Sequence, residues 1–505
     1  MTINSPGVTV RGWIVLGVLA LLTFRLLAIF IIAPIGDEVA LLYMADDFAH
    51  LKNFRAYFYH QDVLGPLEAY FIAPFYRFFG FSFWAGRFYN NLFFFLPLVG
   101  MFLWVVRRLF DRELTAYLFV LLSVLPFPAL FLTTMVQRVP MLTLALLSLV
   151  LLLKLAEGQG KFSWKSLSCG FVSGLAFWFH PISVVWLVPI GISLLWLIPT
   201  GERMKLLFRF ALGFLAGLFP VWIHGIRTGV LMSAEGHGGS GFTGPGEVLQ
   251  MAYLFFVRAK YYLSTFSYGN VSSLVDQLVR WLSLIPFVLF SASFAALSFH
   301  FCRTLRRQQL EEKIFFLFMI LPPLILMPLY CSRNLIEDES ARFLMPLTVT
   351  YVFSVSWWVK SIKSVLLKQG ILAVLISVLL LGNFFSGVQE LKRTLGFRKL
   401  VQFLEEKDLR AGVADIWTAY TINMLSNHRI VASPLPHHAM VEPVWQEVKE
   451  RGPQFLIVDR ASPRLRQRLE ADQNLRRESI AGYDIFYGYS PFLEYLLNFR
   501  QPLPI

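Results

Sequence analysis

Residues 36–68 read GDEVALLYMADDFAHLKNFRAYFYHQDVLGPLE and follow directly on the first long apolar segment of the chain. Only 15% of the residues in this protein are charged, yet six carboxylates fall within this stretch. An acidic cluster at the end of an apolar helix is either a solvated loop or an active site. The six are Asp37, Glu38, Asp46, Asp47, Asp62 and Glu68.

The composition around this stretch is that of a membrane protein. The 505 residues are 56% hydrophobic and 16% aromatic, whereas soluble domains carry about 25% charged residues and seldom repeat apolar runs of ~20 residues. Three cysteines are too few and too scattered for a disulfide framework. We therefore expect an α-helical polytopic membrane protein.

Eleven apolar stretches are candidates for membrane-spanning helices. The first lacks a small-residue cleavage site before Asp37 and is too long for a signal peptide, so we expect it to be retained. The pair that meets at His180–Pro181 is short, and could form one broken helix. The stretches are 12–34, 89–106, 115–132, 140–154, 167–179, 182–198, 206–224, 279–302, 314–330, 343–359 and 370–386.

The loops between these stretches differ in charge. With the N-terminus in the cytoplasm, five loops on that side hold 16 Lys and Arg, whereas the opposite loop 133–139 holds only Arg138 and the loop 331–342 only Arg333 and Arg342. This asymmetry fits the positive-inside rule. We therefore expect the acidic stretch, the loop 226–278 and the tail to lie outside the cytoplasm.

The formal net charge of +13 does not indicate a nucleic-acid partner. Residues 387–505 hold 16 Lys and Arg against 14 Asp and Glu, and much of the remaining excess lies in the short loops. A nucleic-acid-binding protein would carry a basic face on a soluble domain. The glycine-rich segment 236–246 lacks the GK[ST] ending of a phosphate-binding loop, so we expect a mobile loop there.

The tail changes character at about residue 387. Short apolar runs, GVADIW, RIVAS, QFLIVD and YDIFYGY, alternate with polar helical segments such as EPVWQEVKERG and SPRLRQRLE. This alternation predicts a small α/β domain over residues 387–505, beyond a catalytic membrane domain over residues 1–386. The acidic loop would span residues 36–88 and the mobile loop residues 226–278.

Several motifs, in this order, resemble a known superfamily. GDE at 36–38, YFYHQDVLGPLEAYFIAPFYRFFG at 57–80, GLAFWFHP at 174–181, LFPVWIHGIRTG at 218–229 and ARFLMPL at 341–347 resemble the GT-C superfamily of polyprenyl-phosphate-sugar glycosyltransferases. The tail segment GVADIWTAYTINMLSNHRIVASP is similar to the exterior tail of some bacterial members. The chain looks most like bacterial members related to protein O-mannosyltransferases and to the lipid A aminoarabinose transferase.

The resemblance implies a GT-C fold and an activity outside the cytoplasm. Such an enzyme transfers a sugar from a polyprenyl (undecaprenyl) phosphate carrier to an extracytoplasmic glycan, lipid or protein. The resemblance gives Asp37 the role of general base, with Glu38 beside it as support or substitute. A base in that role needs hydrogen-bond reach to the acceptor hydroxyl and a suitable pKa. A single displacement would invert the anomeric configuration.

Other residues are candidates for substrate contacts. Cations near the exterior surface would stabilise the leaving phosphate, and Arg342 matches an arginine of the family. Each arginine among the candidates could instead bind bulk lipid headgroups. For Arg87 a salt bridge that pins the loop is a further alternative, and His180 could be purely structural. The candidates are Tyr59, Gln61, Glu68, Arg87, Arg138, His180, Arg333 and Arg342.

We expect no cofactor and no metal, although Asp46 and Asp47 could bind a divalent ion through oxygen ligands. The expected location is the bacterial inner membrane. Three other functions stay open: a transporter or flippase for lipid-linked glycans, a glycan ligase or polymerase, and a non-catalytic scaffold. A transporter would favour internal repeats, and none is convincing here.

Overall fold

A computed structural model describes residues 10–34, 36–58, 64–134, 139–158, 163–197, 203–229, 245–263, 274–331, 344–434, 442–458 and 463–493. The chain forms two compact units. The first comprises Met1–Ile29, Val63–Gly65 and Phe88–Ser386, and the second comprises Phe30–Asp62, Pro66–Arg87 and Gly387–Ile505. The division at residue 386 coincides with the change in composition. The sequence did not indicate that most of the acidic loop belongs with the tail.

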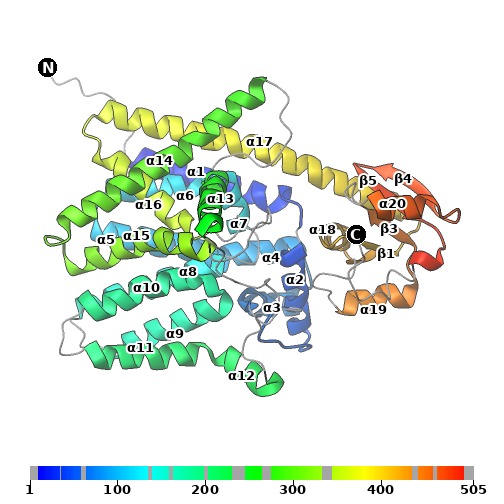
Figure 1. The fold of residues 1–505 in the computed structure, drawn as a ribbon, viewed down its shortest axis with the longest axis horizontal. Helices are drawn as coiled ribbons and strands as arrows, with labels where there is room; N and C mark the ends of the chain where they lie inside the picture. The colour runs from blue at the N-terminus through cyan, green and yellow to red at the C-terminus, as the bar shows by residue number, and fades with distance from the viewer. Residues whose placement is uncertain are drawn as a thin grey trace. The chain divides into compact units, whose positions relative to one another are not determined.

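Helices make up most of the described residues before the tail (Figure 1). Each of the eleven stretches expected to span the membrane contains helix, although some also include short non-helical breaks. In chain order the helices are α1 (Val10–Ile31), α2 (Gly36–Ala49), α3 (Leu67–Phe79), α4 (Phe83–Asn90), η1 (Asn91–Phe95), α5 (Leu96–Leu109), α6 (Arg112–Ser123), α7 (Phe127–Thr134), α8 (Val139–Glu157), α9 (Ser163–Phe179), η2 (Pro181–Ser183), α10 (Val184–Ile192), η3 (Ser193–Leu197), α11 (Arg203–Gly217), α12 (Phe219–Thr228), α13 (Pro245–Leu263), α14 (Leu274–Thr304), α15 (Leu310–Cys331), α16 (Leu347–Ser361) and α17 (Val365–Glu406).

Not all of these helices are long enough to cross a bilayer alone. Among the described residues, six are long and apolar enough, and the number rises to eight if two bent pairs each count as one span. The bent pairs are α6–α7, with a bend of 79°, and α11–α12, with a bend of 51°. The expected count of eleven is therefore not confirmed, because α9 and α16 have only 17 and 15 residues.

Buried polar side chains satisfy the backbone where the spans of the first unit break. At the bend between α6 and α7, the amide of Asn383 donates to the carbonyl of Leu125 at 3.0 Å. Such freed carbonyls need a protein partner inside a membrane.

Arg25, buried in α1, donates to the hydroxyls of Thr133 and Thr134 at 2.7 and 3.0 Å. These threonines form the last turn of α7, where the negative end of the helix dipole favours a cation.

Three of the basic loops come together at one end of the first unit. Arg108 pairs with Glu157, Lys360 with Asp111, and Lys368 with Glu113 at 2.8 Å. These ion pairs join the loops that follow α5, α8 and α16. The charge asymmetry requires these three loops to share one side of the membrane, and the ion pairs agree with it.

Helices α9 and α11 pack with their backbones in contact. Each carries a pair of glycines four residues apart, Gly170 and Gly174 in α9, Gly213 and Gly217 in α11. A Cβ atom at any of the four positions would collide with a backbone carbonyl of the other helix. Two GxxxG motifs therefore face each other, as in close helix pairs of membrane proteins.

The tail forms a five-stranded sheet of order β2-β1-β3-β5-β4. Strands β1, β2 and β3 are parallel, whereas β5 runs antiparallel to β3 and to β4. The small α/β domain expected from the sequence is thus present. Its elements are β1 (Ala411–Ala414), α18 (Ile416–Leu425), β2 (Val431–Pro434), α19 (Glu442–Arg451), β3 (Phe455–Val458), α20 (Pro463–Glu470), β4 (Arg476–Ile480) and β5 (Tyr483–Tyr487).

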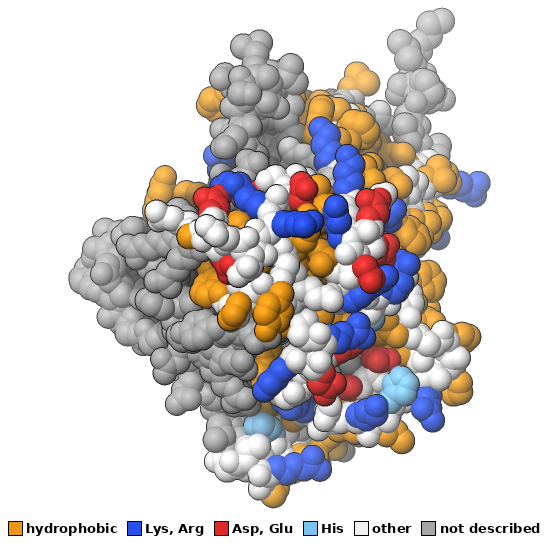
Figure 2. Space-filling model, turned by 90° about the vertical axis from the view of Figure 1, so that its right-hand side faces the viewer, with side chains coloured by type: hydrophobic (Ala, Val, Ile, Leu, Met, Phe, Trp, Pro, Cys, Tyr) orange, Lys and Arg blue, Asp and Glu red, His pale blue; other side chains and the backbone are white. Residues whose placement is uncertain are grey.

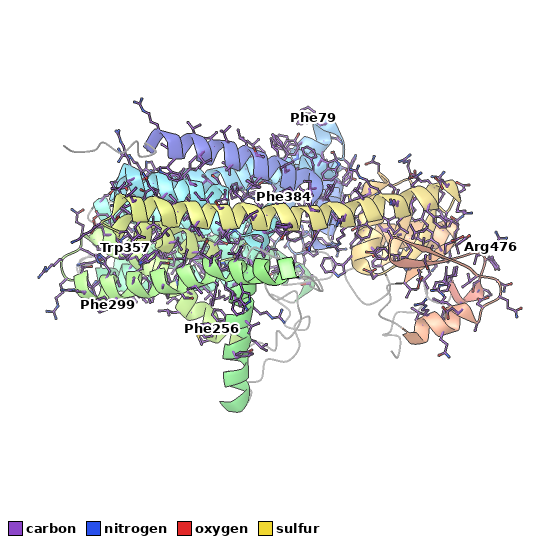
Figure 3. All side chains as sticks on the ribbon, turned by 90° about the horizontal axis from the view of Figure 1, so that it is seen from above. Phe79, Phe256, Phe299, Trp357, Phe384 and Arg476 are labelled. Carbon is purple, nitrogen blue, oxygen red and sulfur yellow. The ribbon has the colours of Figure 1, made fainter. Side chains whose placement is uncertain are left out.

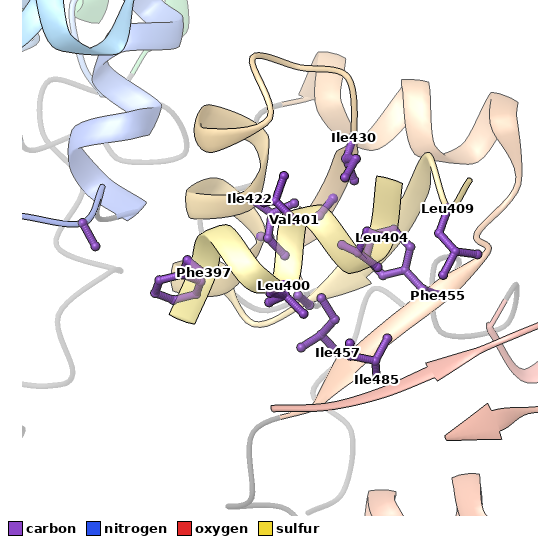
Figure 4. Packing of buried hydrophobic residues seen from close by; sticks show 14 residues of the cluster. Phe397, Leu400, Val401, Leu404, Leu409, Ile422, Ile430, Phe455, Ile457 and Ile485 are labelled. Atoms are coloured by element: carbon purple, nitrogen blue, oxygen red, sulfur yellow. The ribbon is translucent and has the colours of Figure 1, made fainter. Parts of the chain in front are cut away.

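One core joins the end of α17 to this sheet (Figure 4). Phe397, Leu400 and Leu404 of α17 pack on Ile457 and Ile485 of the central strands. Ala33, from the turn between α1 and α2, belongs to the same buried cluster. The beginning of the acidic stretch is therefore part of the core of the second unit.

The exposed side chains indicate which surfaces suit lipid and which suit water. In the first unit, Phe299 of α14 and Phe384 of α17 project outward from their helices, as expected of side chains that face lipid (Figure 3). Figure 2 shows Lys and Arg side chains intermingled with Asp and Glu on the face that it displays. No broad basic surface is visible among the described residues of that face.

Candidate active site

The candidate site is built around helix α2, which begins at Gly36, just beyond the end of the apolar helix α1. Residues Val39–Ala45 are buried on every side of the helix. Asp37 lies in its first turn, where backbone N–H groups and the helix dipole favour a carboxylate. The side chain of Asp37 lies outside the described part of the structure.

Four successive backbone carbonyls lead into α2, and a side chain donates to each of them. The donors come from three helices that are far apart in the sequence. Because every carbonyl of this turn is satisfied in a buried setting, its conformation is fixed. The donors are Thr394 Oγ1 for Ile31 at 2.7 Å, Arg87 Nη1 for Ile32 at 2.7 Å, Arg87 Nη2 for Ala33 at 3.2 Å, and Thr421 Oγ1 for Pro34 at 2.8 Å.

Arg87 also forms a two-pronged ion pair with Glu38. Arg87 Nε donates to Oε1 of the carboxylate at 2.7 Å, and Nη2 donates to Oε2 at 2.6 Å. Both side chains are fully buried, and the guanidinium stacks 4.4 Å from the ring centre of Phe83. The salt bridge that the sequence left as an alternative for Arg87 is therefore present. A contact of Arg87 or Glu38 with a substrate stays a prediction.

Gly86 makes room for this ion pair. A Cβ atom at Gly86 would lie 2.5 Å from the side chain of Leu42 and 2.6 Å from the hydroxyl of Tyr76. The missing side chain lets α4 approach α2 closely, and Arg87 then reaches Glu38 across the short gap. The Gly-Arg dipeptide is a signal that sequence reasoning could have used.

Asp46 and Asp47 lie at the other end of α2. The carboxylate of Asp46 is 3.5 Å from His50, and Asp47 accepts a hydrogen bond from Asn53 at 3.1 Å. Partial burial raises the pKa of Asp46. The described residues contain no group of three side chains arranged to hold a metal ion. Metal binding by this pair has no further support from the structure.

Glu68 and His180 are both buried, in different units. Glu68 lies in the first turn of α3 in the second unit. His180 follows α9 in the first unit, and its Nδ1 accepts from the N–H of Ile182 at 3.2 Å. This bond caps the short turn η2 and gives the histidine a structural role. Substrate contacts by Glu68 and His180 stay predictions.

The other candidates cannot be placed. Five of them lie outside the described residues: Tyr59, Gln61, Arg138, Arg333 and Arg342. The structure describes the chain again from residue 64. There Gly65 donates to the carbonyls of Trp178 and Phe179 at 3.2 Å, and a Cβ atom at Gly65 would lie 2.6 Å from the Trp178 ring. This contact joins two of the family-like motifs within the first unit.

The sequence did not indicate a contact between a tyrosine of α2 and a histidine of the tail. The hydroxyl of Tyr43 lies 3.2 Å from Nδ1 of His428, and both rings contact Phe81. Burial raises the pKa of Tyr43 well above its usual value and lowers the pKa of His428. His428 and Asn427 both have positive φ angles, 61° and 49°. The only signal for His428 in the sequence was its place in the family-like tail segment.

Comparisons with known proteins agree with this architecture. A sequence model of the dolichyl-phosphate-mannose-protein mannosyltransferase family matches residues 64–224. The crystal structure of apo ArnT from Cupriavidus metallidurans is similar with a TM-score of 0.57 at 12% sequence identity, covering 94% of this chain and 98% of that one. The chain has the GT-C fold.

Two further structures share the GT-C fold. ArnT from C. metallidurans bound to undecaprenyl phosphate gives a TM-score of 0.58 at 12% identity, with 95% of this chain and 99% of that chain covered. The Archaeoglobus fulgidus oligosaccharyltransferase in complex with Zn and sulfate gives 0.51 at 10% identity, with 93% and 73% covered. No curated protein sequence matched the chain. The family match and the GT-C fold together make the protein a membrane glycosyltransferase.

Proposed function

We propose that this GT-C enzyme transfers a sugar from polyprenyl phosphate to a hydroxyl of an extracytoplasmic glycan, lipid or protein. The carrier is supported by the family description and by the ArnT structure bound to undecaprenyl phosphate. The location in the bacterial inner membrane, with the site facing the periplasm, is supported by the charge asymmetry of the loops.

In the proposed reaction Asp37 is the general base. Its carboxylate takes the proton of the acceptor hydroxyl while the hydroxyl oxygen attacks the anomeric carbon. The bond between that carbon and the phosphate oxygen breaks, and polyprenyl phosphate leaves as an anion. One displacement inverts the anomeric configuration. Arg138, Arg333 and Arg342 are the proposed cations for the leaving phosphate.

The observation that carries this proposal is the fixed turn before Asp37. Three donor side chains hold the four carbonyls of residues 31–34, and the buried Arg87–Glu38 pair holds the residue next to Asp37. A catalytic base needs such support, because a displacement of 1 Å can cost about 100-fold in rate. Glu38 and Arg87 are then positioning residues.

A reconstituted assay tests the function. The purified full chain in liposomes receives a radiolabelled polyprenyl-phosphate sugar and a crude envelope acceptor. We expect label on the acceptor together with release of one polyprenyl phosphate for each sugar, and an inverted linkage by NMR. Movement of the labelled lipid across the bilayer without transfer would instead indicate a transporter. Transfer of a preassembled chain would indicate a ligase or polymerase.

A further inference from the structure

The end of helix α3 exposes two adjacent phenylalanines in the second unit. Phe78 and Phe79 are 80% and 77% exposed, although the opposite face of α3 is buried through Ile72 and Tyr76. Phe79 projects from the periphery in Figure 3. Leaving a phenylalanine in water forgoes about 1.5–3 kcal/mol of burial free energy for each side chain.

The exposed end has an ordered conformation. Gly80, with a φ of 79°, ends the helix, and its N–H donates to the carbonyl of Tyr76 at 2.9 Å. The hydroxyl of Tyr76 donates to the carbonyl of Ser82 at 2.8 Å. These bonds close the turn between α3 and α4, so the two phenyl rings are presented on a structured tip.

The chain places this tip next to the membrane. The apolar span Phe83–Leu109 begins four residues after Phe79, and four residues reach at most about 14 Å. The headgroup region adds about 5–8 Å on each side of the hydrocarbon core. Phe78 and Phe79 must therefore lie at or near the lipid interface, where aromatic side chains gather.

A lipid surface suits the tip better than a protein partner. Two phenylalanines offer about 300–500 Å² of contact area, whereas a stable interface between two proteins buries about 1,200–2,000 Å². Arg77, the exposed cation of the last turn, can extend its charge to lipid phosphates while its stem lies along apolar surface.

We propose that Arg77, Phe78 and Phe79 anchor α3 in the bilayer interface, with both rings among the acyl chains and Arg77 on the phosphates. Helix α2 packs against α3, and Phe48 of α2 stacks on Tyr70 of α3 with ring centres 4.6 Å apart. The anchor thereby fixes the depth of α2 and α3, and Asp37 lies in the first turn of α2. The lipid contact itself does not depend on the proposed transfer reaction.

Spin labels on the full chain in phosphatidylcholine–phosphatidylglycerol liposomes test the anchor. The three cysteines are first replaced, and a single cysteine is introduced as Phe79→Cys or Phe78→Cys. Phe384→Cys gives a lipid-facing reference and Arg476→Cys a water-facing reference; both residues are labelled in Figure 3. Collision rates with oxygen and with a water-soluble nickel chelate are measured for each label.

We expect labels at positions 78 and 79 to be more accessible to oxygen than to nickel, as at position 384. Accessibility to nickel like that at position 476 would overturn the proposal. Low accessibility to both reagents would also overturn it, because it would show that protein covers the tip. Neither outcome requires the enzyme to be active, so a failure of the proposed reaction would be seen separately.

Discussion

Glu38 and Arg87 illustrate how a buried charge can be used to hold a backbone turn. The guanidinium has five N–H donors, and four hydrogen bonds from it reach a carboxylate and two carbonyls just after α1. Glu38 directly follows Asp37 in the sequence, so the ion pair holds the residue next to the proposed base.

Glu38→Gln should destabilise the protein strongly. It leaves the Arg87 guanidinium charged and buried without its ionised partner, which costs about 3–5 kcal/mol. Thermal unfolding of the purified full chain should show a clear fall in midpoint. The control is Glu447→Gln, which removes an exposed Glu–Arg pair in α19 that contributes about 0–1 kcal/mol. Equal shifts for the two variants would contradict the assignment.

His428 should make the second unit sensitive to acid. Burial lowers its pKa in the folded state below the value of about 6.5 in an unfolded chain. The unfolded state then binds more protons as the pH falls below that value, so the free energy of unfolding declines there. The contribution is complete above about pH 6.5. Protonation would also remove the acceptor that faces Tyr43.

The unfolding midpoint measured between about pH 7.5 and pH 5 tests this expectation. His428→Asn is the comparison, because asparagine tolerates a positive φ and does not titrate. The variant should lose part of the dependence on pH seen in the wild type. An identical slope in both proteins would show that His428 does not titrate in this range.

At the scale of elements, glycines determine how closely helices approach. Gly170, Gly174, Gly213 and Gly217 bring α9 and α11 into backbone contact, and α9 leads directly to His180. Gly100 in α5 is a glycine without such a contact, because no atom lies within 4 Å of the position that its Cβ atom would take.

The same substitution at two positions should therefore act in opposite directions. Gly213→Ala should force α9 and α11 apart and lower the unfolding midpoint. Gly100→Ala should leave the midpoint unchanged or raise it, because alanine is favoured over glycine in a helix by about 1 kcal/mol. Thermal unfolding in detergent compares the two. A midpoint for Gly213→Ala at or above that of Gly100→Ala would contradict the close packing.

The sequence predicted the type of most elements but not their breaks. Apolar length identified the helical stretches, yet the bend near Pro126 and the one before Pro220 divide ranges that were expected to be single spans. Strands β1, β2, β3 and β5 lie in the apolar runs. Strand β4, RRESI, was missed because its side chains are polar and largely exposed, so no apolar alternation marks it.

Long-range contacts account for what the sequence did not reveal about the site. Asp37 and Glu38 were identified from the resemblance, but nothing local indicates that Thr394 and Thr421 donate to the turn at residues 31–34. Single threonines in helices are common, and their partners lie more than 360 residues away. The association of the acidic loop with the tail follows from such contacts.

For the whole molecule, the charge of the loops determines the expected orientation. The ion pairs that join three basic loops place them at one end of the first unit. The positive-inside rule predicts these loops in the cytoplasm and the tail outside, where the proposed lipid-linked sugar could serve as donor without a nucleotide. The proposed reaction depends on this orientation.

Cysteine accessibility in intact cells tests the orientation. After replacement of the native cysteines, Arg306→Cys lies in a basic loop and Gln473→Cys in the tail, both at exposed positions. A membrane-impermeant maleimide should label position 473 in intact cells, and should label position 306 only after the membrane is opened. The reverse pattern would place the tail in the cytoplasm.

The role of Asp37 is tested most directly by single-turnover transfer at saturating donor. Asp37→Asn should lower the rate by about 10²–10⁴-fold, the usual contribution of a positioned acid or base. Asp408→Asn is the matched control, because Asp408 is an exposed residue of the tail and its loss should leave the rate unchanged. A folded Asp37→Asn protein that transfers sugar at the wild-type rate would contradict the proposed base.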